Sequence, residues 1–293
     1  MRTIAAAVCL ATALSGVPAR AADTPPISLP KLSKWQMNYG DDTCQLAAKF
    51  GSAADSVIME IRRDQPGDHF DLHLYGQRLK FKELTVPVEL TFGMGGTPQW
   101  RDGTSLTLDG PPILPLVRVT NLRVDGLVGL KNAASALPPL TPAIETQITA
   151  ITFKLRMGKP YRLETGSMSA PLAAMRACTD DLIKGWGYDP TVRSGLTHLP
   201  EPANNPSYWV TSLDFPGKSS QAGHNGLVRF RLDVDPAGRP TGCRILYRTN
   251  PDEFADLSCK LLLERARFKP ALDAQAKPVK WFYINTIQWM SVL

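Results

Sequence analysis

The strongest pattern in the chain is a strict alternation of apolar and polar residues over 227–234, Leu-Val-Arg-Phe-Arg-Leu-Asp-Val. Successive side chains of a strand point to opposite faces, so this segment is predicted to be a strand with one buried face. The turn sequence Asp-Pro-Ala-Gly-Arg at 235–239 then predicts a hairpin with a second strand over 242–247. Another element must cover the apolar face of such a hairpin.

A helix is predicted to supply that cover. Residues 250–253, Asn-Pro-Asp-Glu, combine a capping side chain, a proline and acidic residues, all typical of a helix start. Apolar residues then recur at helical spacing up to about Ala266. The segment 268–271, Phe-Lys-Pro-Ala, ends the helix, and Val279–Met290 is predicted to be a third strand. The expected order is two strands, a helix and a strand.

The preceding residues predict a larger module of mostly antiparallel strands over 34–190. Short alternating segments such as Val57–Arg62 and His69–Leu74 are followed by turn sequences rich in Gly and Pro. A helix is expected to close this module, with Ser169 as its cap and its end at Gly185. The predicted fold class is therefore α+β.

The sequence divides into five expected segments. Residues 1–21 are predicted to be a signal peptide and 22–33 a Pro-rich leader. The β-rich module over 34–190 is followed by a linker at 191–205, and the ββαβ module is expected over 206–293. The linker is assigned because the segment holds several turn-forming residues and no periodicity.

The first residues have the three parts of a secretory signal: Arg2, an apolar core from Ile4 to about Leu14, and the sequence Ala-Arg-Ala at 19–21. Cleavage after Ala21 is expected, which predicts a periplasmic protein. The alternative is an uncleaved anchor in the inner membrane, and only then is membrane contact expected. The apolar core is shorter than the ~20 residues that span a bilayer, which favours cleavage.

Export also changes how the cysteines are interpreted. Removal of Cys9 with the signal leaves an even number in a compartment that permits disulfides. Three pairings are possible. Cys243 and Cys259 lie close together in the last module, whereas Cys44 and Cys178 lie near the two ends of the first, so the predicted disulfides are Cys243–Cys259 and Cys44–Cys178. Zinc is disfavoured because no Cys-x-x-Cys motif occurs and no His lies near a Cys.

The last module resembles the C-terminal domain of the TonB family over about residues 206–291. The matching segments are 214–216 (Asp-Phe-Pro), the strand and turn over 226–239, the helix over 252–265, and 267–271 (Arg-Phe-Lys-Pro-Ala). The cysteine pair in this module resembles an exported alphaproteobacterial variant. The resemblance implies an outer-membrane receptor or another envelope protein as partner. Here a folded module replaces the long spacer of TonB energy transducers.

The residues that could support catalysis or bind a metal are few. The segment 166–169, Gly-Ser-Met-Ser, lacks the second glycine of a nucleophile elbow, and oxidised cysteines have no thiolate. His69, Asp71 and His73 share one face of a predicted strand and could bind a metal, but a solvated outer face has the same pattern. We expect no catalytic residue, no cofactor and no metal, and the chain is not expected to be an enzyme. The alternative is a periplasmic enzyme with its site in the first module.

The expected function is binding of a partner protein or envelope component through an open sheet edge. The strand 279–290 provides that surface, with Trp281, Tyr283 and Trp289 as partner-binding residues; the alternative is that these rings fill the core against Phe254. Nucleic acid is disfavoured because the basic excess behind the net charge of +6 is spread among acidic residues. A TonB-type energy transducer with an uncleaved anchor is the other alternative.

Overall fold

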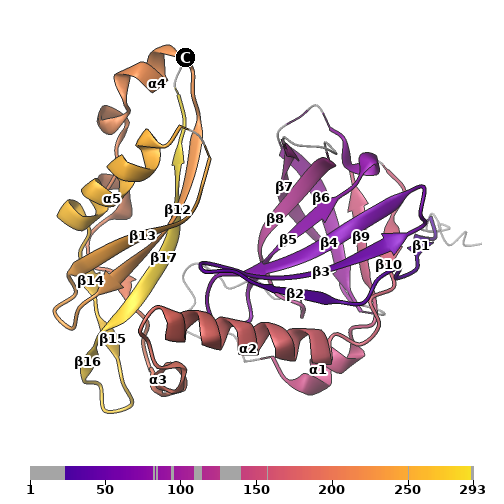
Figure 1. The fold of residues 1–293 in the computed structure, drawn as a ribbon, viewed down its shortest axis with the longest axis horizontal. Coiled ribbons are helices and arrows are strands. Elements are labelled where there is room, and N and C mark those ends of the chain that lie inside the picture. Colours follow the sequence, from indigo (N-terminus) through magenta and orange to yellow (C-terminus); the bar gives the residue numbers. More distant parts are fainter. Residues whose placement is uncertain are drawn as a thin grey trace, which may run out of the picture.

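The computed structural model describes residues 24–81, 83, 85–93, 96–108, 114–125, 140–156, 158–249 and 251–291. The predicted signal peptide and its cleavage site lie outside these residues, as do Met94, Gly95 and Asn250. The described chain forms two modules, shown side by side in Figure 1. Among the described residues, no helix is both long enough and apolar enough to cross a membrane.

The first module is built on one ten-stranded sheet with the order β1-β10-β9-β6-β7-β8-β5-β4-β3-β2. Neighbouring strands are antiparallel, except that β1 and β10 are parallel. The strands are β1 (Ile27–Leu29), β2 (Gln36–Tyr39), β3 (Cys44–Gly51), β4 (Ser56–Arg63), β5 (Phe70–Tyr75), β6 (Thr85–Phe92), β7 (Gln99–Leu108), β8 (Leu114–Leu122), β9 (Ile151–Leu155) and β10 (Tyr161–Leu163). A single turn of 3-10 helix, Gln77–Leu79, follows β5.

This sheet curls until its two ends meet. The segment that follows β1 pairs with the far end of β3: Lys31 bridges Phe50, and the Gly51 N–H donates to the Pro30 carbonyl at 2.9 Å. The predicted Pro-rich leader is therefore part of the sheet, because β1 pairs with β10 on one side and the residues after it reach β3 on the other. The apolar faces of the strands enclose one core.

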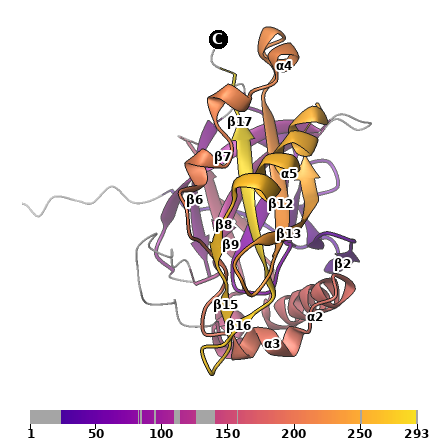
Figure 2. The ribbon, with the colours of Figure 1, turned by 90° about the vertical axis from the view of Figure 1, so that its left-hand side faces the viewer.

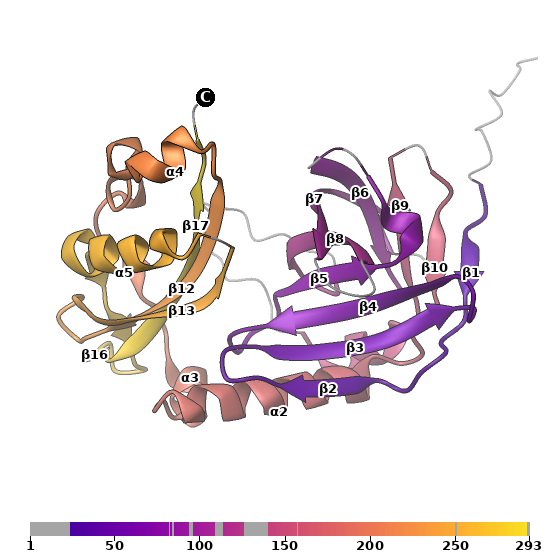
Figure 3. The same cartoon turned by 45° about the horizontal axis from the view of Figure 1, so that its top comes forward.

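Helix α2 (Ser169–Gly185) lies against β2 and β3 and covers this core, as Figures 1 and 3 show. The cap position is Met168 and not Ser169, and no side chain caps the helix start. At its other end, Gly187 has a positive φ of 82°, and the Tyr188 N–H donates to the Ile183 carbonyl at 2.9 Å. This glycine-dependent ending turns the chain toward the second module. The shorter helices α1 (Pro142–Gln147) and α3 (Pro190–Gly195) flank α2.

The second module contains a three-stranded antiparallel sheet with the order β13-β12-β17. Its main elements are β12 (Gly226–Val234), β13 (Pro240–Arg248), α5 (Glu253–Arg265) and β17 (Trp281–Trp289). Helix α5 packs against the face of this sheet that carries the apolar residues of β12. Figure 2 shows the helix in front of β12. In the β12–β13 turn, the Asp235 carboxylate accepts the N–H groups of Ala237 and Arg239.

Shorter elements surround this sheet. They are two 3-10 turns (Pro206–Tyr208 and Ser212–Asp214), α4 (Gly217–Gln221), the pair β11 (Glu201–Pro202) and β14 (Phe268–Lys269), and the pair β15 (Ala271–Leu272) and β16 (Pro278–Val279). The predicted linker, 191–205, contains most of α3 and all of β11. The N–H groups of Thr197 and Ala203 donate to carbonyls of Leu272 and Arg267, so its second half runs along the second module.

Candidate functional site

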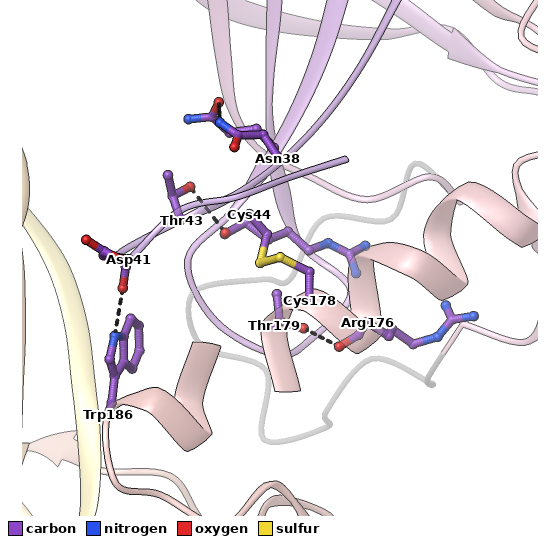
Figure 4. Close-up of a disulfide and its surroundings, with 10 residues drawn as sticks. Asn38, Asp41, Thr43, Cys44, Arg176, Cys178, Thr179 and Trp186 are labelled. Atoms are coloured by element: carbon purple, nitrogen blue, oxygen red, sulfur yellow. Dashed lines mark hydrogen bonds between the residues drawn. A yellow bond between two sulfur atoms is a disulfide. The ribbon is translucent and has the colours of Figure 1, made fainter. Parts of the chain in front are cut away.

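Each module contains one disulfide, which joins a helix to a strand. Cys44 of β3 is bonded to Cys178 of α2, with 6.0 Å between their Cα atoms, and Figure 4 shows how this bond holds the helix against the sheet. Cys243 of β13 is bonded to Cys259 of α5, with Cα atoms 5.6 Å apart. These are the two pairs predicted from the sequence, and each links a helix to the sheet that it covers.

The three aromatic residues expected to bind a partner lie largely inside the second module. Trp281 and Trp289 are each only 2% exposed. Trp289 stacks on Phe254 at 5.1 Å, and its indole N–H donates to Ser258 at 3.1 Å. Tyr283 is half-buried, with its ring 4.9 Å from that of Phe268. Trp281 and Trp289 therefore fill the core, which is the alternative stated for these rings, and the assignment of Tyr283 to a binding surface stays a prediction.

The accessible feature of β17 is its outer edge. In the described part of the chain, β17 is the terminal strand of its sheet and pairs only with β12. The Thr286 N–H donates to the side-chain oxygen of Asn285 at 2.8 Å, so it points away from β12. Because backbone groups alternate in direction along a strand, the N–H groups of Ile284 and Gln288 point outward too. The side chains of Asn285 and Gln288 are exposed beside this edge.

A second feature is the junction between the modules, which begins at the end of α2. The Trp186 indole N–H donates to the Asp41 carbonyl at 3.2 Å, as Figure 4 shows. Its ring meets that of Phe282 at 5.5 Å, and the guanidinium of Arg231 lies 4.2 Å from the ring centre. One tryptophan therefore contacts the first module and two strands of the second.

Polar side chains complete the junction. The Tyr188 hydroxyl donates to Asp233 at 2.8 Å, and burial raises the pKa of Tyr188. Arg229 makes a two-point ion pair with Asp64, and Arg244 makes another with Asp42, at 3.2 and 3.1 Å. The polar face of β12 thus faces the first module, while its apolar face meets α5. Both faces of β12 are therefore packed against other parts of the protein.

A cleft of about 530 Å³ opens beside these contacts. Both modules line it, and Arg231 and Arg244 are the contributions of the second module. The residues around it are Tyr39, Gly40, Asp41, Asp42, Cys178, Asp181, Leu182, Gly185, Trp186, Arg231 and Arg244. No motif in the sequence indicates this cleft, because its residues come from separate elements and meet only when the modules pack together.

His73 and Asp71 on β5, which could bind a metal by their sequence pattern, have surroundings that differ from those of a metal site. His73 is 6% exposed, and its Nδ1 lies 3.2 Å from the Tyr75 hydroxyl. Burial, together with the nearby Arg62 and Arg118, lowers the pKa of His73 to about 3. Asp71 accepts hydrogen bonds from Arg118 and from the Asn121 N–H. Among the described residues, no group of three potential ligands is placed to hold a metal.

Comparison with known proteins identifies part of the second module. Residues 211–290 match the family model for the Gram-negative bacterial TonB protein C-terminal, which is the family that the motifs of this module resemble. The match supports a TonB-like protein of the Gram-negative envelope. No curated protein and no solved structure matches the chain. The match covers the sheet β13-β12-β17 and α5, but it includes neither the ten-stranded sheet nor α2.

Proposed function

We propose that this protein acts in the periplasm by binding an extended segment of an envelope protein along the outer edge of β17, without catalysis. The observation that carries the proposal is the outer edge of this nine-residue strand, which no other strand of the described chain pairs with. An open edge offers alternating N–H and carbonyl groups that an extended peptide can pair with, as in strand addition. The domain match supports an envelope partner, such as an outer-membrane receptor.

The buried aromatics support this role indirectly. Trp281 and Trp289 lie in the core at the two ends of β17, and Tyr283 packs inward between them. A strand held in this way keeps its backbone extended before a partner arrives, which lowers the entropy lost on binding. Affinity then comes from main-chain bonds, and the exposed Asn285 and Gln288 contribute to the choice of partner.

Site-specific photocrosslinking in living cells tests the proposal. A photoreactive residue at Asn285 or Gln288 should give adducts with an envelope protein, and mass spectrometry should map them to one short segment. The control position is Leu263, which is 39% exposed on α5, a helix that packs on β13 and β12. No adduct with that protein is expected there.

The variant Gln288→Pro separates backbone pairing from simple proximity. Proline removes an outward N–H and is tolerated where that group faces solvent, so the module should stay folded. Loss of one main-chain hydrogen bond, of about 1 kcal/mol, should lower the crosslinking yield at Asn285 several-fold. An unchanged yield in this variant, with an unchanged circular dichroism melt, would show that the edge is not the binding surface.

A further inference from the structure

The two disulfides differ in how far solvent reaches them. Cys44 and Cys178 are 0% and 2% exposed, so the sheet and helix of the first module enclose their bond. Cys243 and Cys259 are both partly exposed, and Cys243 lies on β13, which is the terminal strand of its sheet opposite β17. Disulfide exchange requires a thiolate to reach a sulfur atom. The bond of the second module is therefore the one that a thiol reaches in the folded protein.

Helix α5 connects this bond to the opposite edge of the same sheet. The helix lies over β13 and β12, and Cys259 attaches it to β13. At the end of β17, the Trp289 ring stacks on Phe254, and its indole N–H donates to Ser258, which directly precedes Cys259 in the helix. One helix thus carries both the accessible disulfide and the residues that hold the end of β17.

The hydrogen bond between Ser258 and Trp289 makes β17 depend on the position of α5. These two residues are 0% and 2% exposed, so the bond lies inside the core. A buried donor that loses its acceptor costs free energy. Movement of α5 away from the sheet therefore disturbs the end of β17, next to the exposed Gln288 on the edge proposed to bind a partner.

Other contacts should keep the module folded when the disulfide is open. Arg265, the last residue of α5, donates two hydrogen bonds to Asp214 at 2.7 and 2.8 Å, and Leu262 and Ala266 are buried in the core. The disulfide closes a loop with a sequence separation of 16, and its loss removes that restriction on the chain. Local opening of α5 then becomes more frequent without global unfolding.

We propose that the Cys243–Cys259 bond is a redox switch for the edge of β17: a dithiol, such as the Cys-x-x-Cys site of an oxidoreductase, reduces it and lowers the affinity of the edge for its partner. A thiolate of the dithiol attacks one sulfur, the S–S bond breaks, and the other sulfur leaves as a thiolate and takes up a proton. The second thiol, as its thiolate, then attacks the mixed disulfide. The dithiol becomes a disulfide, and the protein gains two electrons and two protons as two thiols.

The switch rests on the proposed function, because it regulates that same edge, but its chemistry can be tested alone. The wild-type protein is treated with dithiothreitol without denaturant, alkylated with iodoacetamide and mapped by mass spectrometry. Cys243 and Cys259 should be alkylated at least tenfold faster than Cys44 and Cys178. Equal rates for the two pairs, or faster alkylation of Cys44 and Cys178, would overturn the switch.

Hydrogen exchange measures what reduction does to the module. After selective reduction, the amides of α5 and of the end of β17 should lose protection at least tenfold, because the helix opens more often. The amides of β4 and β5 in the first module are the control and should keep their protection. Unchanged protection of α5 and β17 in the reduced protein would contradict the coupling between the disulfide and the edge.

Photocrosslinking at Asn285 measures the effect on partner binding. Replacing Cys243 and Cys259 together by Ser prevents the bond and should lower the crosslinking yield several-fold. Lys260→Gln, at an exposed position of the same helix, is the matched control and should leave the yield unchanged.

Ser258→Ala tests the path from the helix to β17. This variant keeps the disulfide but removes the acceptor of the Trp289 indole N–H, so it should also lower the yield at Asn285. A wild-type yield in this variant or in the double Ser variant, with an unchanged circular dichroism spectrum, would overturn the switch and leave the proposed function in place. Absence of any adduct at Asn285 in the wild-type protein would overturn both.

Discussion

Partly or fully buried polar residues mark where the two modules of this protein meet. Arg229 and Arg244 are paired across the junction with Asp64 and Asp42. Arg231 is paired with Asp233 of its own strand, and its guanidinium lies against the ring of Trp186. In the first module, His73 is similarly enclosed, and its Nε2 makes no hydrogen bond among the described residues. The energetic cost of burying such groups makes their titration measurable.

His73 should make the stability of the first module depend on pH. Its pKa of about 3 in the folded protein lies below the ordinary value of 6.5, so between these values the unfolded chain binds a proton that the folded chain does not. The full free energy of unfolding is therefore present above about pH 6.5, and the part linked to His73 is lost as the pH falls toward 3. The slope reaches about 1.4 kcal/mol per pH unit.

Urea unfolding of the wild-type protein and of His73→Gln between pH 7 and pH 4 measures this effect. The wild-type protein should lose more free energy of unfolding over this range, because glutamine does not titrate. Glu60, Asp71, Arg62, Arg118 and Tyr75 surround His73 and remain in both proteins. Parallel curves for the two proteins would mean that His73 takes up its proton in the folded state.

At the scale of the elements, each disulfide links a helix to its sheet, and the two bonds should contribute differently to the stability of the protein. The Cys44–Cys178 bond closes a loop with a sequence separation of 134, and Cys243–Cys259 one of only 16. In the chain-entropy model, these loops correspond to about 5 and about 3 kcal/mol. Replacing Cys44 and Cys178 by Ser should thus lower stability more than replacing Cys243 and Cys259. Denaturant unfolding under non-reducing conditions gives the order, and the reverse order would contradict the model.

Some elements could be predicted from the sequence because local patterns determine them. The alternation over 227–234 lies within β12, and the apolar spacing after Asp252 lies within α5. The strands β7 and β8 were not predicted. Their segment contains little alternation, and in β8 three successive residues, 115–117, are buried, so the two-residue period is hidden. The role of β1 was not predicted either, because its pairing with β10 depends on residues more than a hundred positions away.

The candidate sites were harder to predict than the strands, because they also depend on contacts between residues far apart in the sequence. The cysteine pairs followed from their positions, since each pair belongs to one module. The aromatic residues of β17 were predicted on the correct strand, but composition alone does not show which side chains face α5 or the junction. The cleft requires Asp41, Trp186 and Arg231 to meet, and nothing in their local sequences indicates that contact.

In the whole molecule, an apolar cluster of Ile183 and Tyr188 with Trp281 and Phe282 joins the modules, and Trp186 packs against this cluster. The hydrogen bond of Trp186 to Asp41 fastens the end of α2 to the first module, and the ring contacts of this tryptophan with Arg231 and Phe282 reach the second. The ion pairs Arg229–Asp64 and Arg244–Asp42 add contacts that salt weakens, because they join groups that are partly exposed. Junctions between domains that depend on a few such contacts permit relative motion.

Trp186→Ala should therefore loosen the junction between the modules without unfolding either module. The substitution removes the cation–π contact, worth about 0.5–2 kcal/mol, and the edge-to-face contact with Phe282, worth about 0.5–1.5 kcal/mol. Small-angle X-ray scattering should show a larger radius of gyration, increasing further at high salt as the two ion pairs weaken. Trp100→Ala is the matched control, because Trp100 is 54% exposed on β7. If the scattering of Trp186→Ala equals that of the wild-type protein in high salt, while that variant keeps both disulfides and its circular dichroism spectrum, the junction does not depend on Trp186.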